Sequence, residues 1–212
     1  MKRTPEEIYR TRKQFFNDRA ETWLDTFYRD PETGRLDLHR EGLDRLFSVL
    51  PLRPGDHVLD AGCGSGILVP GILQRITRTG MLYELDFAEK MIETNRSLHP
   101  EDNIRFIVAD AADAPLEDAA CDAVVCFACF PHFHDRERTL RTLSRILKRG
   151  GTLVVAHLES SERLKKHHGS CDAVMHDHLP AESEMRDLFR RSGLRIGMFV
   201  DEPGFYCVRA QK

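Results

Sequence analysis

One short segment, residues 58–66, constrains the fold of this chain more than any other. It reads Val-Leu-Asp-Ala-Gly-Cys-Gly-Ser-Gly, so an apolar run ends in Asp60 and glycine then occupies every second position. The following residues, ILVPGILQRI, have the composition of a helix. Glycines lack Cβ and let the backbone of a strand-to-helix turn come close to a ligand. The segment therefore predicts a strand, a tight turn and a helix, with a nucleotide-like ligand at the turn.

The spacing of these glycines distinguishes two kinds of nucleotide site. A dinucleotide-binding turn has the pattern G-x-G-x-x-G, whose third glycine allows close helix packing. That position is Ile67 in this chain, and the third glycine comes one residue early, as Gly66. The pattern D-x-G-x-G-x-G therefore disfavours an NAD-dependent oxidoreductase, which stays open as an alternative.

Length and composition are typical of a globular protein of one domain. Of the 212 residues, 41% are hydrophobic and 31% are charged. The formal net charge of −3 does not favour nucleic acid as a partner, so we expect a small-molecule substrate. No export signal or membrane span is apparent, which predicts a cytoplasmic protein. Both a monomer and a homodimer are compatible with these features.

Strand-like and helix-like segments alternate from residue 57 onward. Such alternation predicts an α/β fold with a mainly parallel sheet and helices on both faces. A short turn at 202–204 predicts that the last two strands form an antiparallel hairpin, and one helix is expected over 135–149. The expected organisation is one domain, 1–212, with a helical lid at 1–50, a cofactor-binding core at 51–158, a substrate-side insertion at 159–180, and a C-terminal helix and hairpin at 181–212.

Three segments resemble one enzyme family. The glycine turn resembles motif I of the class I S-adenosylmethionine-dependent methyltransferases. FFNDRAETW at 15–23 and LSRILKRGGTLVV at 143–155 are similar to segments of the ubiquinone/menaquinone methyltransferases. The resemblance covers residues 10–158 and implies a Rossmann-like, seven-stranded sheet in the order 3-2-1-4-5-7-6. It also implies methyl transfer from S-adenosylmethionine to a phenol-like, quinol-like or thiol acceptor, with release of S-adenosylhomocysteine.

The same resemblance assigns cofactor roles to residues at the strand ends, where ligands of open α/β sheets bind. It implies that the glycine turn packs against the methionine portion and that Asp60 helps to hold the amino group. Asp86 is expected on the ribose, with Glu84 as the alternative, and Asp110 is expected on the adenine. The full expected set is Asp60, Gly62, Gly64, Gly66, Asp86, Phe87, Met91, Asp110, Ala111, Cys126 and Phe127.

Histidines follow the strands beside which the methyl group should emerge. His132 follows the fourth predicted strand and His157 ends the fifth, while His168 lies in the insertion with His167, His176 and His178. A neutral histidine can deprotonate a phenol, hydroquinone or thiol, so we predict His157, His168 and His132 as bases or acceptor-orienting residues. A metal site of His157, His168 and Asp177 is an alternative, although no tight ligand spacing supports it. A surface or strand-end position without catalytic function stays open for each.

Aromatic residues recur along the first predicted helical segment. They are Tyr9, Phe15, Phe16, Trp23 and Phe27. Such a stripe is typical of core packing, but the resemblance implies that this segment is a lid that excludes water from the reacting centre.

Overall fold

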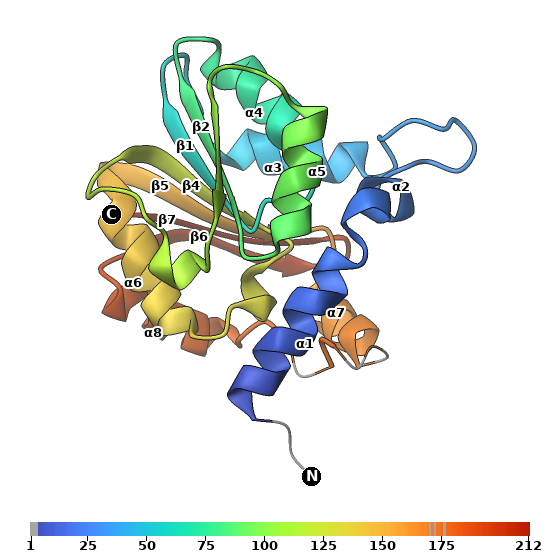
Figure 1. Cartoon of the computed structure of the whole chain (residues 1–212). Helices are drawn as coiled ribbons and strands as arrows, with labels where there is room; N and C mark the ends of the chain where they lie inside the picture. Colours follow the sequence, from blue (N-terminus) through green and yellow to red (C-terminus); the bar gives the residue numbers. More distant parts are fainter. Residues whose placement is uncertain (1–3, 170, 172, 176) are drawn as a thin grey trace.

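The computed structural model describes residues 4–169, 171, 173–175 and 177–212. Its centre is a seven-stranded sheet in the order β3-β2-β1-β4-β5-β7-β6 (Figure 1). The strands are β1 (His57–Ala61), β2 (Met81–Asp86), β3 (Ile104–Val108), β4 (Cys121–Phe127), β5 (Leu147–His157), β6 (Arg195–Glu202) and β7 (Phe205–Gln211).

The direction of the strands agrees with the sequence-based expectation. Strands β1 to β5 run parallel to one another, whereas β7 is antiparallel to both β5 and β6. The predicted fold class and strand order are therefore confirmed. Because β1 lies between β2 and β4, the chain order reverses at β1, and this is where open α/β sheets bind their ligands.

Helices cover both faces of the sheet (Figure 1). One face packs against α6 (Arg136–Ile146) and α8 (Glu182–Arg191), the other against α3 (Arg40–Val49), α4 (Val69–Ile76) and α5 (Glu89–Leu98). Side chains of β4 alternate between the two cores: Val124 and Cys126 enter the first, Val125 and Phe127 the second. This alternation decides which strand residues can reach a ligand.

The N-terminal segment is broken into short helices. Helix α1 (Pro5–Asn17) begins with a capping box, in which Thr4 and Glu7 exchange side-chain to backbone hydrogen bonds. A 3-10 turn (Ala20–Thr22) and α2 (Trp23–Phe27) follow. Lys13 of α1 forms an ion pair with Glu89 at the start of α5, at 2.5 Å, so α1 is anchored to the cofactor-side helices.

Two local differences from the sequence-based expectation have clear causes. The helix expected over 135–149 ends at Ile146, because the buried Leu147 pairs with Cys121 and begins β5. The insertion contains an additional helix, α7 (Ser161–His168), capped by the Ser160 side chain. Short 3-10 turns also follow β3 (Ala111–Asp113) and β4 (Phe130–His132).

None of the helices that the structure describes is both long enough and apolar enough to span a membrane. The expected cytoplasmic location and the division of the chain into lid, core and insertion stay predictions.

Candidate active site

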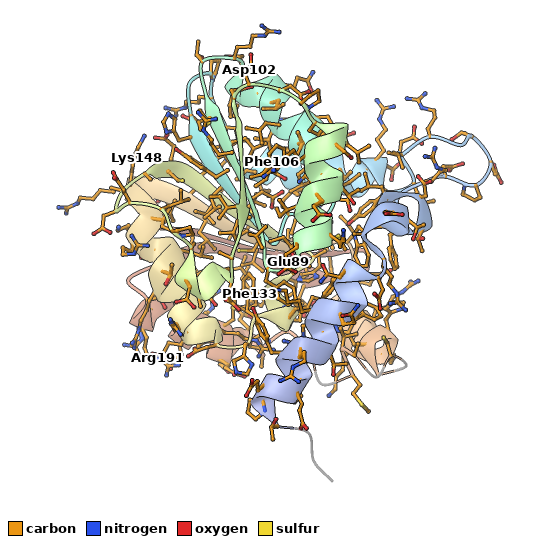
Figure 2. The ribbon with its side chains drawn as sticks, in the orientation of Figure 1. Glu89, Asp102, Phe106, Phe133, Lys148 and Arg191 are labelled. Atoms are coloured by element: carbon orange, nitrogen blue, oxygen red, sulfur yellow. The ribbon has the colours of Figure 1, made fainter. Side chains whose placement is uncertain are left out.

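A pocket lies at the carboxyl ends of β1 to β4, under the N-terminal helices. Its empty volume is about 840 Å³ with the open mouth included. The glycine turn forms its floor and Tyr9, Phe16 and Trp23 of the N-terminal segment contribute its cover. In Figure 2, Phe133 and Glu89 lie next to α1, on the sides of β4 and α5 respectively.

The glycine turn has a backbone that requires glycine at position 62. Gly62 has a left-handed φ of 82°, and a Cβ there would come within 2.6 Å of Cys129 Cβ. The turn is tied to β2 because the Gly62 N–H donates to the carbonyl of Leu85 at 2.7 Å. The Gly64 N–H donates to Asp86 Oδ2 at 3.0 Å. The turn is thus fixed in position and leaves an open surface on its pocket side.

Two buried acids reach the pocket from adjacent strands. Asp60 is 1% exposed, and its Oδ1 has no hydrogen-bond partner among the described residues. Burial, followed by the charges of Glu84, Cys126 and Asp86, raises the pKa of Asp60. Burial also raises the pKa of Asp86 to about 6, against the opposing effect of the Ala88 and Gly64 N–H groups. These carboxyl groups are well placed to receive polar or cationic groups of a ligand.

Glu84 lies outside this lining. It is fully buried, accepts a hydrogen bond from Asn95 Nδ2 at 2.6 Å, and has a pKa raised to about 8, chiefly by burial. The geometry therefore favours Asp86 over Glu84 at the ribose position.

Most residues of the expected cofactor set line the pocket, but two do not. The lining includes Asp60, Gly62, Gly64, Asp86, Phe87, Met91, Asp110, Ala111 and Phe127. Cys126 is corrected: strand alternation directs it into the core, and Cys129 lines the pocket instead. Gly66 is also outside the lining, and a Cβ there would collide with the Asn95 side chain, so this glycine permits packing against α5.

The sequence analysis did not identify several lining residues, among them Tyr28 and Cys129. Tyr28 follows Leu24 by four residues, and this helical spacing indicates that the two pocket-lining side chains share one face. Cys129 comes after Ala128, whose φ of 54° ends the strand alternation. The sequence pattern therefore does not indicate where the Cys129 side chain points. The Cys129 thiol donates to the Ala61 carbonyl at 2.9 Å and joins β4 to β1 beneath the pocket.

His132 is the one predicted catalytic histidine that lines the pocket in the described part of the chain. Its Nδ1 lies 2.7 Å from Asp177 Oδ2. The other carboxylate oxygen, Oδ1, lies 2.5 Å from Arg12 Nη2. Burial is the largest cause that lowers the pKa of His132, although Asp177 opposes it. Burial thus favours the neutral form of His132, and a buried carboxylate orients its ring.

His168 and His157 lie behind His132 rather than in the pocket lining. His168 Nδ1 donates to the Asp177 backbone carbonyl at 2.6 Å, and its ring centroid is 5.1 Å from that of His132. His157 is 2% exposed, and burial together with the charges of His132 and His168 lowers its pKa to about 3. Direct proton transfer by these two histidines therefore has no support from the geometry.

The metal alternative has no support in the described residues. They contain no group of three or more His, Cys, Asp or Glu side chains arranged to hold a metal ion. Both oxygens of Asp177 already have partners, and one of these is the Arg12 cation. His176 lies outside the described residues.

Comparison with known proteins finds methyltransferases. Residues 59–155 match the family described as a methyltransferase domain. The chain is 33% identical to 27-O-demethylrifamycin SV methyltransferase of Amycolatopsis mediterranei over 162 residues, 73% of this chain and 59% of the relative. It is 27% identical to a ubiquinone/menaquinone biosynthesis C-methyltransferase of Vibrio cholerae over 128 residues, 56% of this chain and 49% of the relative.

A solved structure supports the fold over the whole length. A SAM-dependent methyltransferase from Aquifex aeolicus superposes with a TM-score of 0.69 at 20% identity, covering 99% of this chain and 98% of that one. Residues 59–155 therefore match a methyltransferase domain, and the solved structure that resembles the chain over its length is an S-adenosylmethionine-dependent methyltransferase. It spans about half to three fifths of the length of the two curated relatives.

Proposed function

We propose that this chain transfers a methyl group from S-adenosylmethionine to a hydroxyl group of a small aromatic molecule. The observation that carries the proposal is the position of His132: it faces the pocket with one ring nitrogen held by Asp177, opposite the glycine turn expected to hold the cofactor. Aromatic O-methylation needs a bound methyl donor and a base for the acceptor hydroxyl, and the glycine turn and His132 would provide for these two needs.

The residues in the pocket fit S-adenosylmethionine. Its α-ammonium group would satisfy the unpartnered Oδ1 of Asp60, and its ribose diol would donate to Asp86. Asp110 and Ala111, at the end of β3, would take the adenine edge. The bound cofactor supplies an electrophilic methyl group on a sulfonium.

The base function falls to His132. An Asp177 carboxylate at Nδ1 favours the tautomer whose Nδ1 carries the proton, which leaves Nε2 free to accept one. The lowered pKa keeps Nε2 unprotonated near pH 7, so the imidazole can take the proton of a phenolic or quinol hydroxyl during attack on the methyl group.

The class of acceptor follows from the pocket walls. Tyr9, Phe16, Phe87 and Phe133 give an aromatic lining suited to a flat, largely apolar molecule. Of the two relatives, the 27-O-demethylrifamycin SV methyltransferase is named for an oxygen acceptor, whereas the ubiquinone/menaquinone biosynthesis enzyme is named a C-methyltransferase. A phenol or hydroquinone is therefore favoured over a charged acceptor.

Methyl transfer from labelled S-adenosylmethionine to a panel of phenols, hydroquinones and thiols tests the proposal. His132→Ala should lower kcat by about 10²- to 10⁴-fold, the usual contribution of a positioned base, and leave S-adenosylhomocysteine binding intact. His134→Ala, two residues away and exposed, is the matched control and should transfer at the wild-type rate. Undiminished turnover by His132→Ala would remove His132 as the base, and failure of wild-type protein on every acceptor would reject the proposed reaction class.

A further inference from the structure

Arg12 is a buried cation on α1, whose other residues are half-buried or exposed. It is 5% exposed, and Asp177, its partner 165 residues later in the chain, is also 5% exposed. A buried ion pair is costly to form and leaves an uncompensated charge when one partner is removed. This pair joins the first helix to the insertion.

The Arg12 guanidinium contacts both His132, the proposed base, and Asp177, the carboxylate that orients it. Nη2 donates to Asp177 Oδ1 at 2.5 Å, and Nη1 donates to the backbone carbonyl of His132 at 2.7 Å. Asp177 in turn holds His132 Nδ1. One side chain thus fixes the carboxylate and the backbone of the histidine at once, a task suited to the planar, forked donor set of arginine.

Arg12 lies on the face of α1 that covers the pocket. Tyr9 precedes it by three residues and Phe16 follows it by four, spacings that place all three side chains on one side of a helix. Tyr9 and Phe16 both line the pocket, and the Phe16 ring lies 5.3 Å from the ring of His132. When this face of α1 packs over the pocket, Arg12 therefore contacts Asp177.

We propose that Arg12 is a positioning residue that makes the orientation of His132 depend on the seating of α1 over the pocket. The proposal rests on the proposed function, because it assigns a role in that reaction. With α1 seated, Arg12 holds Asp177, Asp177 holds His132, and the aromatic side chains exclude water. With α1 displaced, the carboxylate loses its cation and His132 loses its fixed backbone. The base is therefore assembled only under a closed pocket.

The charged and titratable groups around His132 come from four elements. They are Arg12 on α1, Asp177 in the insertion, His168 on α7 and, further back, His157 on β5. Among these, Arg12 opposes protonation of His132 and Asp177 favours it. Removal of the Arg12 cation therefore has a defined sign: it makes His132 easier to protonate.

Three variants separate positioning from simple structural support. Arg12→Met removes the cation, Arg12→Lys keeps it but cannot hold two acceptors in a fork, and Arg10→Met removes an exposed cation of the same helix as the control. The measurements are the pH dependence of kcat, the KM for S-adenosylmethionine, and an NMR titration of the His132 imidazole, assigned by its loss in His132→Asn.

Arg12→Met should lower kcat on the order of 10- to 100-fold, as expected for a misplaced base, with KM for the cofactor little changed. Its kcat profile and imidazole titration should both move to higher pH. Arg12→Lys should keep the wild-type titration midpoint and still lose kcat. Arg10→Met should match the wild type in every measurement.

An unchanged His132 midpoint together with wild-type kcat in a folded Arg12→Met protein would overturn the proposal. If that variant fails to fold, Arg12→Lys decides: a wild-type kcat overturns the proposal, and a reduced kcat with unchanged cofactor KM supports it. The NMR titration needs no turnover, so a wild-type protein without methyl transfer would contradict the proposed function and still leave the Arg12 effect on His132 measured.

Discussion

Asp86 is the residue on which the cofactor side of the site depends most. Its two carboxylate oxygens accept from the Gly64 and Ala88 N–H groups, at 3.0 and 2.9 Å, and so hold the glycine turn against the start of α5. The same carboxylate lines the pocket. It therefore shapes the turn and, in the proposed function, would also accept from the ribose of the cofactor.

We expect Asp86→Asn to weaken S-adenosylhomocysteine binding by about tenfold or more, because one oxygen is replaced by an amide donor that cannot accept from the backbone or from a ribose hydroxyl. Isothermal titration calorimetry measures this change. Asp113→Asn, whose ion pair with Arg138 is exposed, is the control. Wild-type affinity in Asp86→Asn would return the ribose role to another acid, Glu84 first.

At the residue scale, motifs that fix both identity and spacing predicted residues that line the pocket, and their contacts with a cofactor stay predictions. Asp60, Gly62, Gly64, Asp86 and Asp110 all line the pocket, because the ends of parallel strands converge on one edge of the sheet. The prediction failed for Cys126, since the direction of a side chain near a strand end depends on where pairing stops. Contacts such as that of Arg12 with Asp177 had no local pattern to reveal them.

At the scale of elements, α1 lies where its aromatic pattern alone does not place it. Its aromatic stripe is typical of core packing, yet Tyr9 and Phe16 line the pocket while Phe15 packs under the Arg19 guanidinium at 3.8 Å. Phe16 also contacts the rings of Trp23 and Phe87. The helix is therefore a cover that uses core-type residues on its pocket side.

Phe16→Ala should weaken S-adenosylhomocysteine binding on the order of tenfold, because loss of a half-buried aromatic contact of this kind amounts to about 1.4 kcal/mol. Phe15→Ala is its matched control, one residue earlier on the same helix and outside the pocket lining. Fluorescence or calorimetric titration compares the two. Equal losses in both variants would show that α1 supports the fold rather than the pocket.

Among the elements, strands were predicted more reliably than helix ends. Buried parallel strands read as continuous apolar runs, which makes them visible in a sequence. The end of α6 depended on the pairing of Leu147 with Cys121, which local propensity does not encode, whereas α7 has a local cap in Ser160.

At the scale of the whole molecule, the fold is the family's sheet with its site assembled from distant segments. The proposed cofactor side lies in the core between β1 and β5, which overlaps the match over residues 59–155. The proposed acceptor side combines α1 with the insertion near Asp177. The sequence indicated the cofactor side because its motifs are contiguous. For the acceptor side it indicated only candidate histidines, because burial and hydrogen bonding decide which of them reaches the pocket.

Ligand binding by the intact chain tests the central claim, that this pocket is a site for S-adenosylmethionine, most directly. Calorimetric titration of the wild-type chain with S-adenosylhomocysteine and, separately, with NAD measures it. The account predicts saturable binding of one S-adenosylhomocysteine per chain and no binding of NAD, since Ile67 stands where a dinucleotide turn needs its third glycine. Binding of NAD without binding of S-adenosylhomocysteine would contradict it.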